Sequence, residues 1–158
     1  MKAIVYRKYG PPEVLKFEEL PQPEPGRDEV LVTVHASSVN AADWHMIRGT
    51  PFLVRLMAGG LRKPRHIIPG ADFAGKVEAV GSDVKDFRPG DEVYGDLSGA
   101  GFGAFAEYAS VPVKYLAKKP GNISYEEAAA IPLAGVTALQ AVRDTGRVKA
   151  GQKVLVNG

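Results

Sequence analysis

The chain has 158 residues, of which 20 are Lys or Arg and 18 are Asp or Glu, so its formal net charge at neutral pH is only +2. Its 45% of hydrophobic and 24% of charged residues are ordinary for a globular protein, and the length suffices for one domain with its own core. The basic residues are scattered rather than gathered into a surface that could neutralise phosphates, so we expect no nucleic-acid partner.

The sequence contains no run of about eighteen apolar residues, so neither a transmembrane helix nor a membrane partner is expected. Residues 1–5 are typical of a strand and lack the apolar core and cleavage site of a signal peptide, which predicts a cytoplasmic location. Cysteine is absent, which removes disulfides, thiolate nucleophiles and the sulfur ligands of structural or alcohol-dehydrogenase zinc sites.

Six short stretches rich in Val, Ile, Phe and Tyr are separated by Gly, Pro and Asp, and we expect each to form a β-strand. These stretches are residues 2–6, 14–20, 28–38, 72–81, 91–96 and 104–111. In the third stretch Val30, Val32 and Val34 fall on one face, the alternation expected of a partly buried strand. Many short strands separated by turns favour a β-barrel or a β-sandwich.

The sequence changes character after residue 121 and predicts two helices. Ser124 with Glu127 three positions later is a capping box, so a helix is expected to begin there. Pro132 cannot continue that helix but can open a second one, which would run to Arg143 and close near Gly146.

Residues 151–158 predict a turn followed by an apolar strand. Continuously apolar strands are typical of parallel sheets that are covered on both faces, and one strand alone cannot make such a sheet. We therefore expect further chain to come after this strand in the whole protein.

Several motifs occur in an order that is typical of one enzyme superfamily. They are Gly70-Ala71-Asp72-Phe73-Ala74-Gly75, Val80-Gly81, Pro89-Gly90-Asp91-Glu92-Val93 and Gly103-Ala104-Phe105-Ala106-Glu107-Tyr108. On these motifs the chain resembles the zinc-independent NADPH:quinone oxidoreductases of the medium-chain dehydrogenase/reductase superfamily, and the likeness extends over almost all of its length. Four matches in the correct order are far more specific than any one of them alone.

The resemblance implies a fold that is mainly β with α. Residues 1–121 would form a GroES-like catalytic domain, a partly open β-barrel with flanking helices. Residues 122–150 would be a helical connection, and residues 151–158 the first strand of a truncated Rossmann domain. The glycine-rich turn that holds a dinucleotide would begin at Gly158, so we expect the fragment to bind NADPH weakly or not at all and to be inactive. The full-length protein is expected to be a homodimer, and the fragment a monomer.

The same resemblance indicates that no metal site is present. Where zinc-dependent relatives carry a Cys and a His as ligands, this sequence has Asn40 and Ala71. The three histidines, His35, His45 and His66, do not pair at spacings typical of a metal site.

Residues 39–49 are the expected wall of the active site. By resemblance, Asn40 lies beside the nicotinamide and ribose of the cofactor, and His45 faces the substrate as the candidate catalytic residue. An amide suits a neutral polar cofactor because it offers a donor and an acceptor. The alternatives are that Asn40 only caps the following turn and that His45 is simply exposed. Asp43 is expected to be structural, capping a helix over residues 44–48.

Two further cofactor-binding residues are implied. Thr137 would approach the nicotinamide carboxamide, or else be a buried helical Thr whose hydroxyl donates to a backbone carbonyl; Gly158 would belong to the pyrophosphate turn. The apolar residues 51–61 line the substrate cleft or form a helix packed on the core, and the sequence leaves both open.

These features together predict hydride transfer from NADPH to a quinone or an α,β-unsaturated carbonyl. Such substrates spread the developing negative charge themselves, so the protein would mainly orient the cofactor and exclude water. The alternatives are a GroES-like module used for protein contacts and, against the missing ligands, a zinc alcohol dehydrogenase. A glycine-rich turn and further βα units after Gly158 would favour an enzyme, and a genuine end of the chain there would favour an interaction module.

Overall fold

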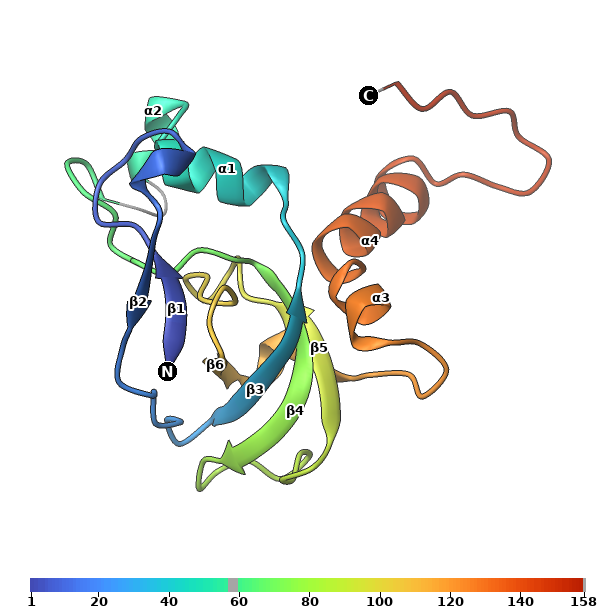
Figure 1. Ribbon diagram of the computed structural model, residues 1–158. Helices are drawn as coiled ribbons and strands as arrows, with labels where there is room; N and C mark the ends of the chain where they lie inside the picture. The colour runs from blue at the N-terminus through green and yellow to red at the C-terminus, as the bar shows by residue number, and fades with distance from the viewer. Residues whose placement is uncertain (57–59, 158) are drawn as a thin grey trace.

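In a computed structural model, which describes residues 1–56 and 60–157, the chain is mainly β with short helices at one end of a curved sheet (Figure 1). The strands are β1 (Lys2–Val5), β2 (Lys16–Glu19), β3 (Glu29–Ser37), β4 (Asp72–Val80), β5 (Glu92–Asp96), β6 (Tyr108–Pro112) and β7 (Leu116–Lys118). The α-helices are α1 (Ala41–Arg48), α2 (Phe52–Val54), α3 (Tyr125–Ala129) and α4 (Pro132–Leu139), with 3-10 turns η1 (Pro12–Val14) and η3 (Val113–Tyr115) and a π-helical turn η4 (Gln140–Thr145).

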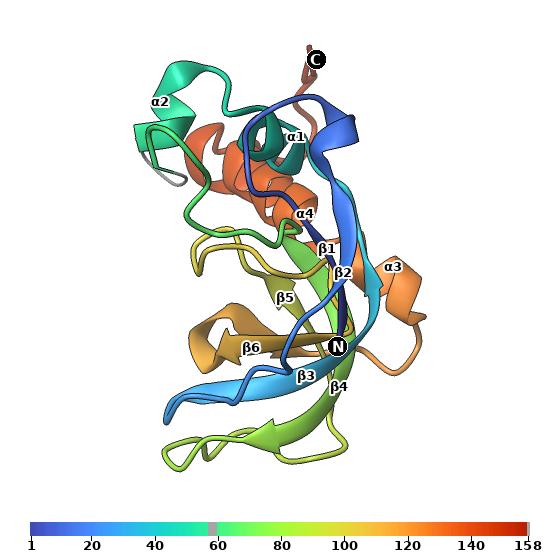
Figure 2. The ribbon, with the colours of Figure 1, turned by 60° about the vertical axis from the view of Figure 1, so that its left-hand side comes forward.

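Five strands form one antiparallel sheet in the order β6-β3-β4-β5-β7, while β1 and β2 form a separate pair. The pair is tied to the rest of the chain by a bridge between Ala3 and Ala106. Register shifts between β3 and β4 lie at Leu31/Val32 and Val34/Ala36, and such bulges bend a sheet. The curvature is visible in Figure 2. The predicted fold class, mainly β with α and partly open, is confirmed.

The strand predictions agree with the structure except near the end of the sheet. The expected strand over 104–111 begins only at Tyr108, and β7 was not predicted. Val30 and Val32 are fully buried and Val34 packs against the same core, as the alternation predicts, but Leu31 on the opposite face of β3 is buried as well. That core also contains Phe73, Val77, Val93, Leu97, Ala104, Ala109 and Val111.

Both predicted helices are present. The Ser124 hydroxyl accepts the backbone N–H of Glu127 at 3.1 Å, and the Glu127 carboxylate accepts the backbone N–H of Ser124 at 2.8 Å, which is the predicted capping box. The second helix begins with Pro132 and continues through η4 to a C-cap at Gly146, so its last turn is π-helical rather than α-helical.

The strand predicted in residues 151–158 does not form in the part of it that the structure describes. Residues 152–157 are extended but pair with no other described segment, and Leu155 is 91% exposed. A strand needs neighbours for its backbone hydrogen bonds, and this segment has none within the described chain. Gly158, the predicted pyrophosphate residue, lies outside the described residues. Across residues 1–56 and 60–157, no helix has the length and apolarity required to cross a membrane.

Two tyrosines are held in environments that favour their neutral form. Tyr6 is 2% exposed, and burial is the main factor that raises its pKa to about 12. Tyr125 stacks on His35 with ring centroids 4.5 Å apart and donates its hydroxyl to Glu92 at 2.9 Å. Burial, followed by the bond to Glu92, raises the pKa of Tyr125 to about 12.

We expect the free energy of unfolding to fall as the pH rises from about 10 to 12. An unfolded tyrosine loses its proton near pH 10, so in this range the folded chain binds more protons than the unfolded chain. Tyr125→Phe should weaken this dependence because it removes one of the tyrosines whose pKa is raised. Urea unfolding followed by circular dichroism across this range tests the expectation. Identical pH dependence in the wild type and the variant would contradict it.

Candidate functional site

A buried carboxylate at the start of β4 joins three segments of the chain. Asp72 is 0% exposed, and its carboxylate accepts the backbone N–H of Leu133 at 3.0 Å. It also accepts the Asn40 side-chain nitrogen at 3.2 Å and the Ser38 hydroxyl at 3.3 Å. Burial raises the pKa of Asp72, while the hydrogen bonds from Asn40, Leu133 and Ser38 oppose that rise. The end of β3, the start of α1 and the start of α4 therefore meet at Asp72.

The local sequence explains why these donors point at Asp72. Pro132 occupies the first helical position of α4, so the N–H of Leu133 is one of the amides for which the helix itself has no acceptor. A carboxylate at a helix N-terminus satisfies such an amide and interacts favourably with the helix dipole. Figure 1 shows α1 and α4 at the end of the sheet where β3 finishes and β4 begins.

Asn40 is held in one orientation. It is the N-cap of α1, and its backbone N–H is accepted by the Asp43 carboxylate at 2.8 Å in a capping box. Its amide nitrogen donates to Ser38 and to Asp72, both at 3.2 Å. Because a carboxylate only accepts, the nitrogen must face Asp72. Both amide hydrogens are therefore used. In the capping box the oxygen faces the backbone N–H of Asp43, so its second lone pair is left to accept a bond from a ligand.

Asp43 has the structural role that the sequence predicts, although α1 begins at Ala41 rather than at Trp44. Its carboxylate is 0% exposed and accepts the backbone N–H of Asn40 and, at 3.1 Å, that of Gly70. Burial raises the pKa of Asp43, and these backbone donors oppose the rise. Asp43 thus fastens α1 to the segment that enters β4.

His45 lies one turn further along α1 and is partly buried. Its Nδ1 is 2.7 Å from the carbonyl oxygen of Thr50, and its ring meets the ring of Trp44 edge-on at 4.6 Å. A carbonyl only accepts, so Nδ1 carries a proton and Nε2 is the atom left for exchange with a substrate or water. The His45 ring therefore bonds to the end of α1, whereas the Asn40 side chain bonds to Asp72 at its start, and the helix places the two residues on different faces.

Thr137 is exposed on α4, and its hydroxyl donates to the carbonyl oxygen of Leu133 at 2.7 Å. This is the alternative that the sequence left open, except that the side chain is not buried. The residue is nevertheless linked to Asn40, because Leu133 also donates its N–H to Asp72. The structure therefore brings Asn40 and the Thr137 turn together through Asp72, a residue that we did not predict as part of the site.

The residues present do not fit a zinc ion. Asn40 directs its amide nitrogen at Asp72, and the buried carboxylates of Asp43 and Asp72 face N–H donors. Ala71 offers only a methyl group where a ligand would be needed. Within residues 1–56 and 60–157, no three His, Cys, Asp or Glu side chains are grouped so that they could hold a metal ion.

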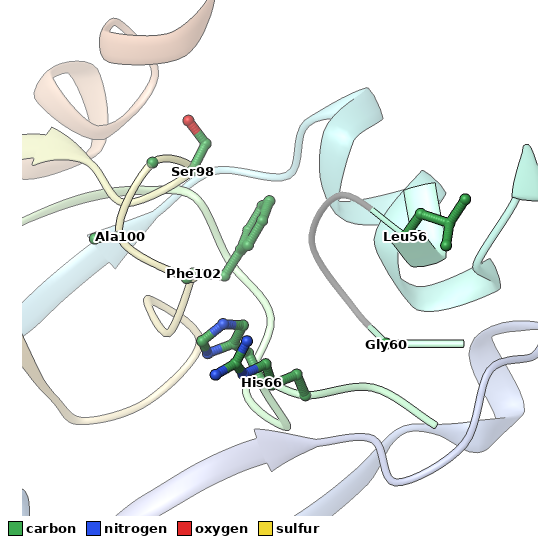
Figure 3. Close-up of a pocket in the computed structure, with 9 residues that line it drawn as sticks. Leu56, Gly60, His66, Ser98, Ala100 and Phe102 are labelled. Carbon is green, nitrogen blue, oxygen red and sulfur yellow. The ribbon is translucent and has the colours of Figure 1, made fainter. Parts of the chain in front are cut away.

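A pocket of about 400 Å³ lies between the segment that follows α2 and the loop after β5 (Figure 3). Its described lining residues are Leu56, Gly60, Arg65, His66, Ser98, Gly99, Ala100, Gly101 and Phe102. Leu56 and Gly60 belong to the apolar segment 51–61, so part of this segment lines a cavity, and its role in a substrate cleft stays a prediction. Phe52 and Leu53 are 60% and 64% exposed and do not pack on the core. Asn40, His45 and Thr137 do not line this pocket.

Residues 26–121 match the family model of the alcohol dehydrogenase GroES-like domain. The chain belongs to this family. Quinone-oxidoreductase QR1 of Triphysaria versicolor is 39% identical over 145 residues, which is 90% of this chain and 42% of the relative. NADPH-dependent alkenal/one oxidoreductase of Arabidopsis thaliana is 40% identical over 163 residues, which is 99% of this chain and 40% of the relative.

The solved quinone oxidoreductase of Coxiella burnetii superposes with a TM-score of 0.84 at 36% identity, over 96% of this chain and 46% of that one. The resemblance to the quinone oxidoreductases of the medium-chain dehydrogenase/reductase superfamily is therefore confirmed. The chain spans less than half the length of these relatives.

Proposed function

We propose that the chain is the catalytic part of a zinc-independent oxidoreductase that transfers hydride from NADPH to a quinone or an α,β-unsaturated carbonyl. The observation that carries the proposal is Asn40, whose amide nitrogen is fixed by Ser38 and Asp72 and whose oxygen, one lone pair of which faces the backbone N–H of Asp43, keeps a second lone pair to accept. The names of the relatives, which include a quinone oxidoreductase and an NADPH-dependent alkenal/one oxidoreductase, support the reaction class. We further propose that the whole protein is a cytoplasmic homodimer.

NADPH, when bound, would supply the hydride, and the residues of this chain would orient the cofactor and exclude water. Asn40 would accept a hydrogen bond from a hydroxyl or amide of the cofactor. Because its side-chain amide is already fixed, less conformational entropy is lost on binding. Thr137 lies one turn after Leu133 on α4, and its hydroxyl donates to the carbonyl oxygen of Leu133. Reduction of an enone needs a proton in addition to the hydride, and water, or His45 Nε2 when the ring carries protons on both nitrogens, delivers it. Gly158 belongs to the part of the site that holds the cofactor phosphates.

The test is NADPH consumption, followed by absorbance, with a panel of quinones and enones. Protein expressed from the complete reading frame is compared with the 158-residue chain. We expect consumption by the former alone. No consumption by either, and no change of cofactor fluorescence on mixing, would contradict the proposal and favour an interaction module.

The role of Asn40 has its own test in the active protein. Asn40→Ser keeps a good helix N-cap but removes the amide. We expect kcat/KM for NADPH to fall about threefold to tenfold, the loss of one hydrogen bond to a neutral group. Asn122→Ala, a matched change on the exposed loop before α3, is the control and should leave the kinetics unaltered. Equal kinetics in Asn40→Ser and the wild type would limit Asn40 to its capping role.

A further inference from the structure

One wall of the pocket of Figure 3 belongs to a long part of the chain without negative charge, and the other, residues 98–102, follows Asp96, whose carboxylate is occupied by bonds from Ser98. Between Trp44 and Ala71 the sequence has no Asp or Glu. It has five cationic residues there, namely Arg48, Arg55, Arg62, Lys63 and Arg65. The basic residues are therefore less evenly scattered than the whole composition suggests.

Two of these cationic side chains are already engaged. Arg55 donates its Nε to the carbonyl oxygen of Gly49 at 2.8 Å, and its guanidinium lies 4.6 Å from the ring centroid of Tyr9. Arg48 lies 4.9 Å from the ring centroid of Trp44. Arg65, in contrast, lines the pocket, and none of the ion pairs among the described residues includes it. Among the described residues its guanidinium therefore has no ionic partner.

The loop after β5 is shaped to hold His66 beside Arg65. Gly101 has a φ of +105°, and a Cβ there would come within 2.6 to 3.0 Å of three atoms of the His66 ring. Only glycine permits both the backbone conformation and this close approach. The histidine and the arginine therefore present two neighbouring N–H donors at the same wall of the pocket.

The remaining lining is mixed, with the apolar side chains of Leu56 and Phe102 beside Ser98 and glycine backbone. Phe102 has a φ of +68°, which is unfavourable for a bulky residue, and such strained residues cluster at functional sites. Figure 3 shows its ring facing Leu56 across the pocket, with His66 next to it. Two apolar side chains beside an arginine and a histidine suit a flat molecule that carries an acidic group.

The pocket is attached directly to the strand of the candidate site. Leu97 donates its N–H to the carbonyl oxygen of Ala71 at 2.8 Å, and Gly103 donates to that of Gly70 at 3.0 Å. These residues precede Asp72 in the chain, so the loop that forms the pocket wall is fixed beside the Asn40 and Asp72 centre.

We propose that this pocket binds a carboxylate on the substrate, so that the enzyme prefers acidic enones and Arg65 determines that specificity. The inference rests on the proposed function for its substrate class. Arg65 and His66 donate to the carboxylate, and Leu56 and Phe102 cover the planar part of the molecule.

The first experiment compares an acid with its neutral ester in the protein expressed from the complete reading frame. The substrates are trans-3-benzoylacrylic acid and its methyl ester, with NADPH as the reductant. The wild type should have a lower KM for the acid. Arg65→Gln should raise that KM about tenfold, the effect of losing a charged hydrogen-bond donor, and leave the KM for the ester unchanged. Arg62→Gln, an equal change of charge outside the pocket lining, should alter neither.

The second experiment needs no turnover. The ring resonances of His66 are followed by NMR while the acid or the ester is added to the same protein. The acid should shift them, the ester should not, and Arg65→Gln should abolish the shift. If NADPH is not consumed but this pattern appears, the pocket binds a carboxylate as proposed and the proposed reaction class is wrong.

Two results would overturn the inference. One is an equal KM for acid and ester in the wild type, with no shift of His66 by the acid. The other is an Arg65→Gln variant in which the KM for NADPH rises and that for the acid does not, because the pocket would then hold a phosphate of the cofactor.

Discussion

Replacing Gly75 by alanine is expected to prevent the domain from folding. Gly75 lies in β4 opposite Val34 of β3, in the middle of the five-stranded sheet. A Cβ at this position would lie 2.1 Å from the carbonyl oxygen of Thr33 and 2.9 Å from a methyl group of Val32. The first of these atoms is backbone, so the clash can be relieved only if β3 and β4 separate. We expect a loss of about 3 kcal/mol or more in the free energy of unfolding, the upper range for overpacking.

Gly121→Ala is the matched control, because a Cβ there meets nothing within 4 Å and the residue has no positive φ. We expect it to be neutral or to stabilise by up to about 1 kcal/mol through the unfolded chain. The soluble yield and the urea unfolding of the two variants test this expectation. A Gly75→Ala protein as stable as Gly121→Ala would show that the two central strands are not packed this closely.

The same close approach explains why the sequence motifs contain glycine. Gly75 and Gly81 belong to motifs that carried the resemblance, and a Cβ at Gly81 would lie 2.0 Å from a backbone carbonyl oxygen. These two motif glycines therefore mark places where two backbones touch. They identify the fold strongly, but they carry little information about the substrate, since fold alone is a weak guide to chemistry.

Elements stabilised by local interactions could be predicted from the sequence. The capping box of α3 spans four residues, and the alternation in β3 is visible within nine. In contrast, β7 has three residues without an alternating pattern and depends on its pairing with β5. Residues 152–157 have the composition of a strand, but their composition cannot supply the neighbours that a strand requires.

The candidate site follows the same rule. Asn40 was identified by resemblance, and the structure adds that its amide nitrogen is already used. Asp72 was not singled out, because its partner Leu133 is 61 residues away and no local pattern links the two. Arg65 and His66 were not singled out for the same reason, since the pocket forms only when the loop of residues 98–102 folds against them.

Asp72→Ala is expected to destabilise the protein by about 2 to 4 kcal/mol, from lost hydrogen bonds and a cavity at a fully buried position. The N–H of Leu133 loses its acceptor, and so do the side chains of Asn40 and Ser38. Because Asp72 also orients Asn40, kcat/KM for NADPH should fall even at temperatures where the variant remains folded. Asp83→Asn, on an exposed pair with Arg27, is the control and should cost less than about 1 kcal/mol.

Asp72→Asn separates the charge of Asp72 from its shape. Burial raises the pKa of Asp72 in the folded chain above its ordinary value of 3.8. At pH values between 3.8 and the raised pKa, the folded chain therefore binds more protons than the unfolded chain. The wild type therefore gains stability from this group as the pH falls through that range, and the amide variant has no such gain. We expect the difference in free energy of unfolding between wild type and Asp72→Asn to increase as the pH is lowered from 7 towards about 4. A difference that shrinks on acidification would mean that Asp72 is ionised more readily in the folded chain than in the unfolded one, and that its donors outweigh its burial.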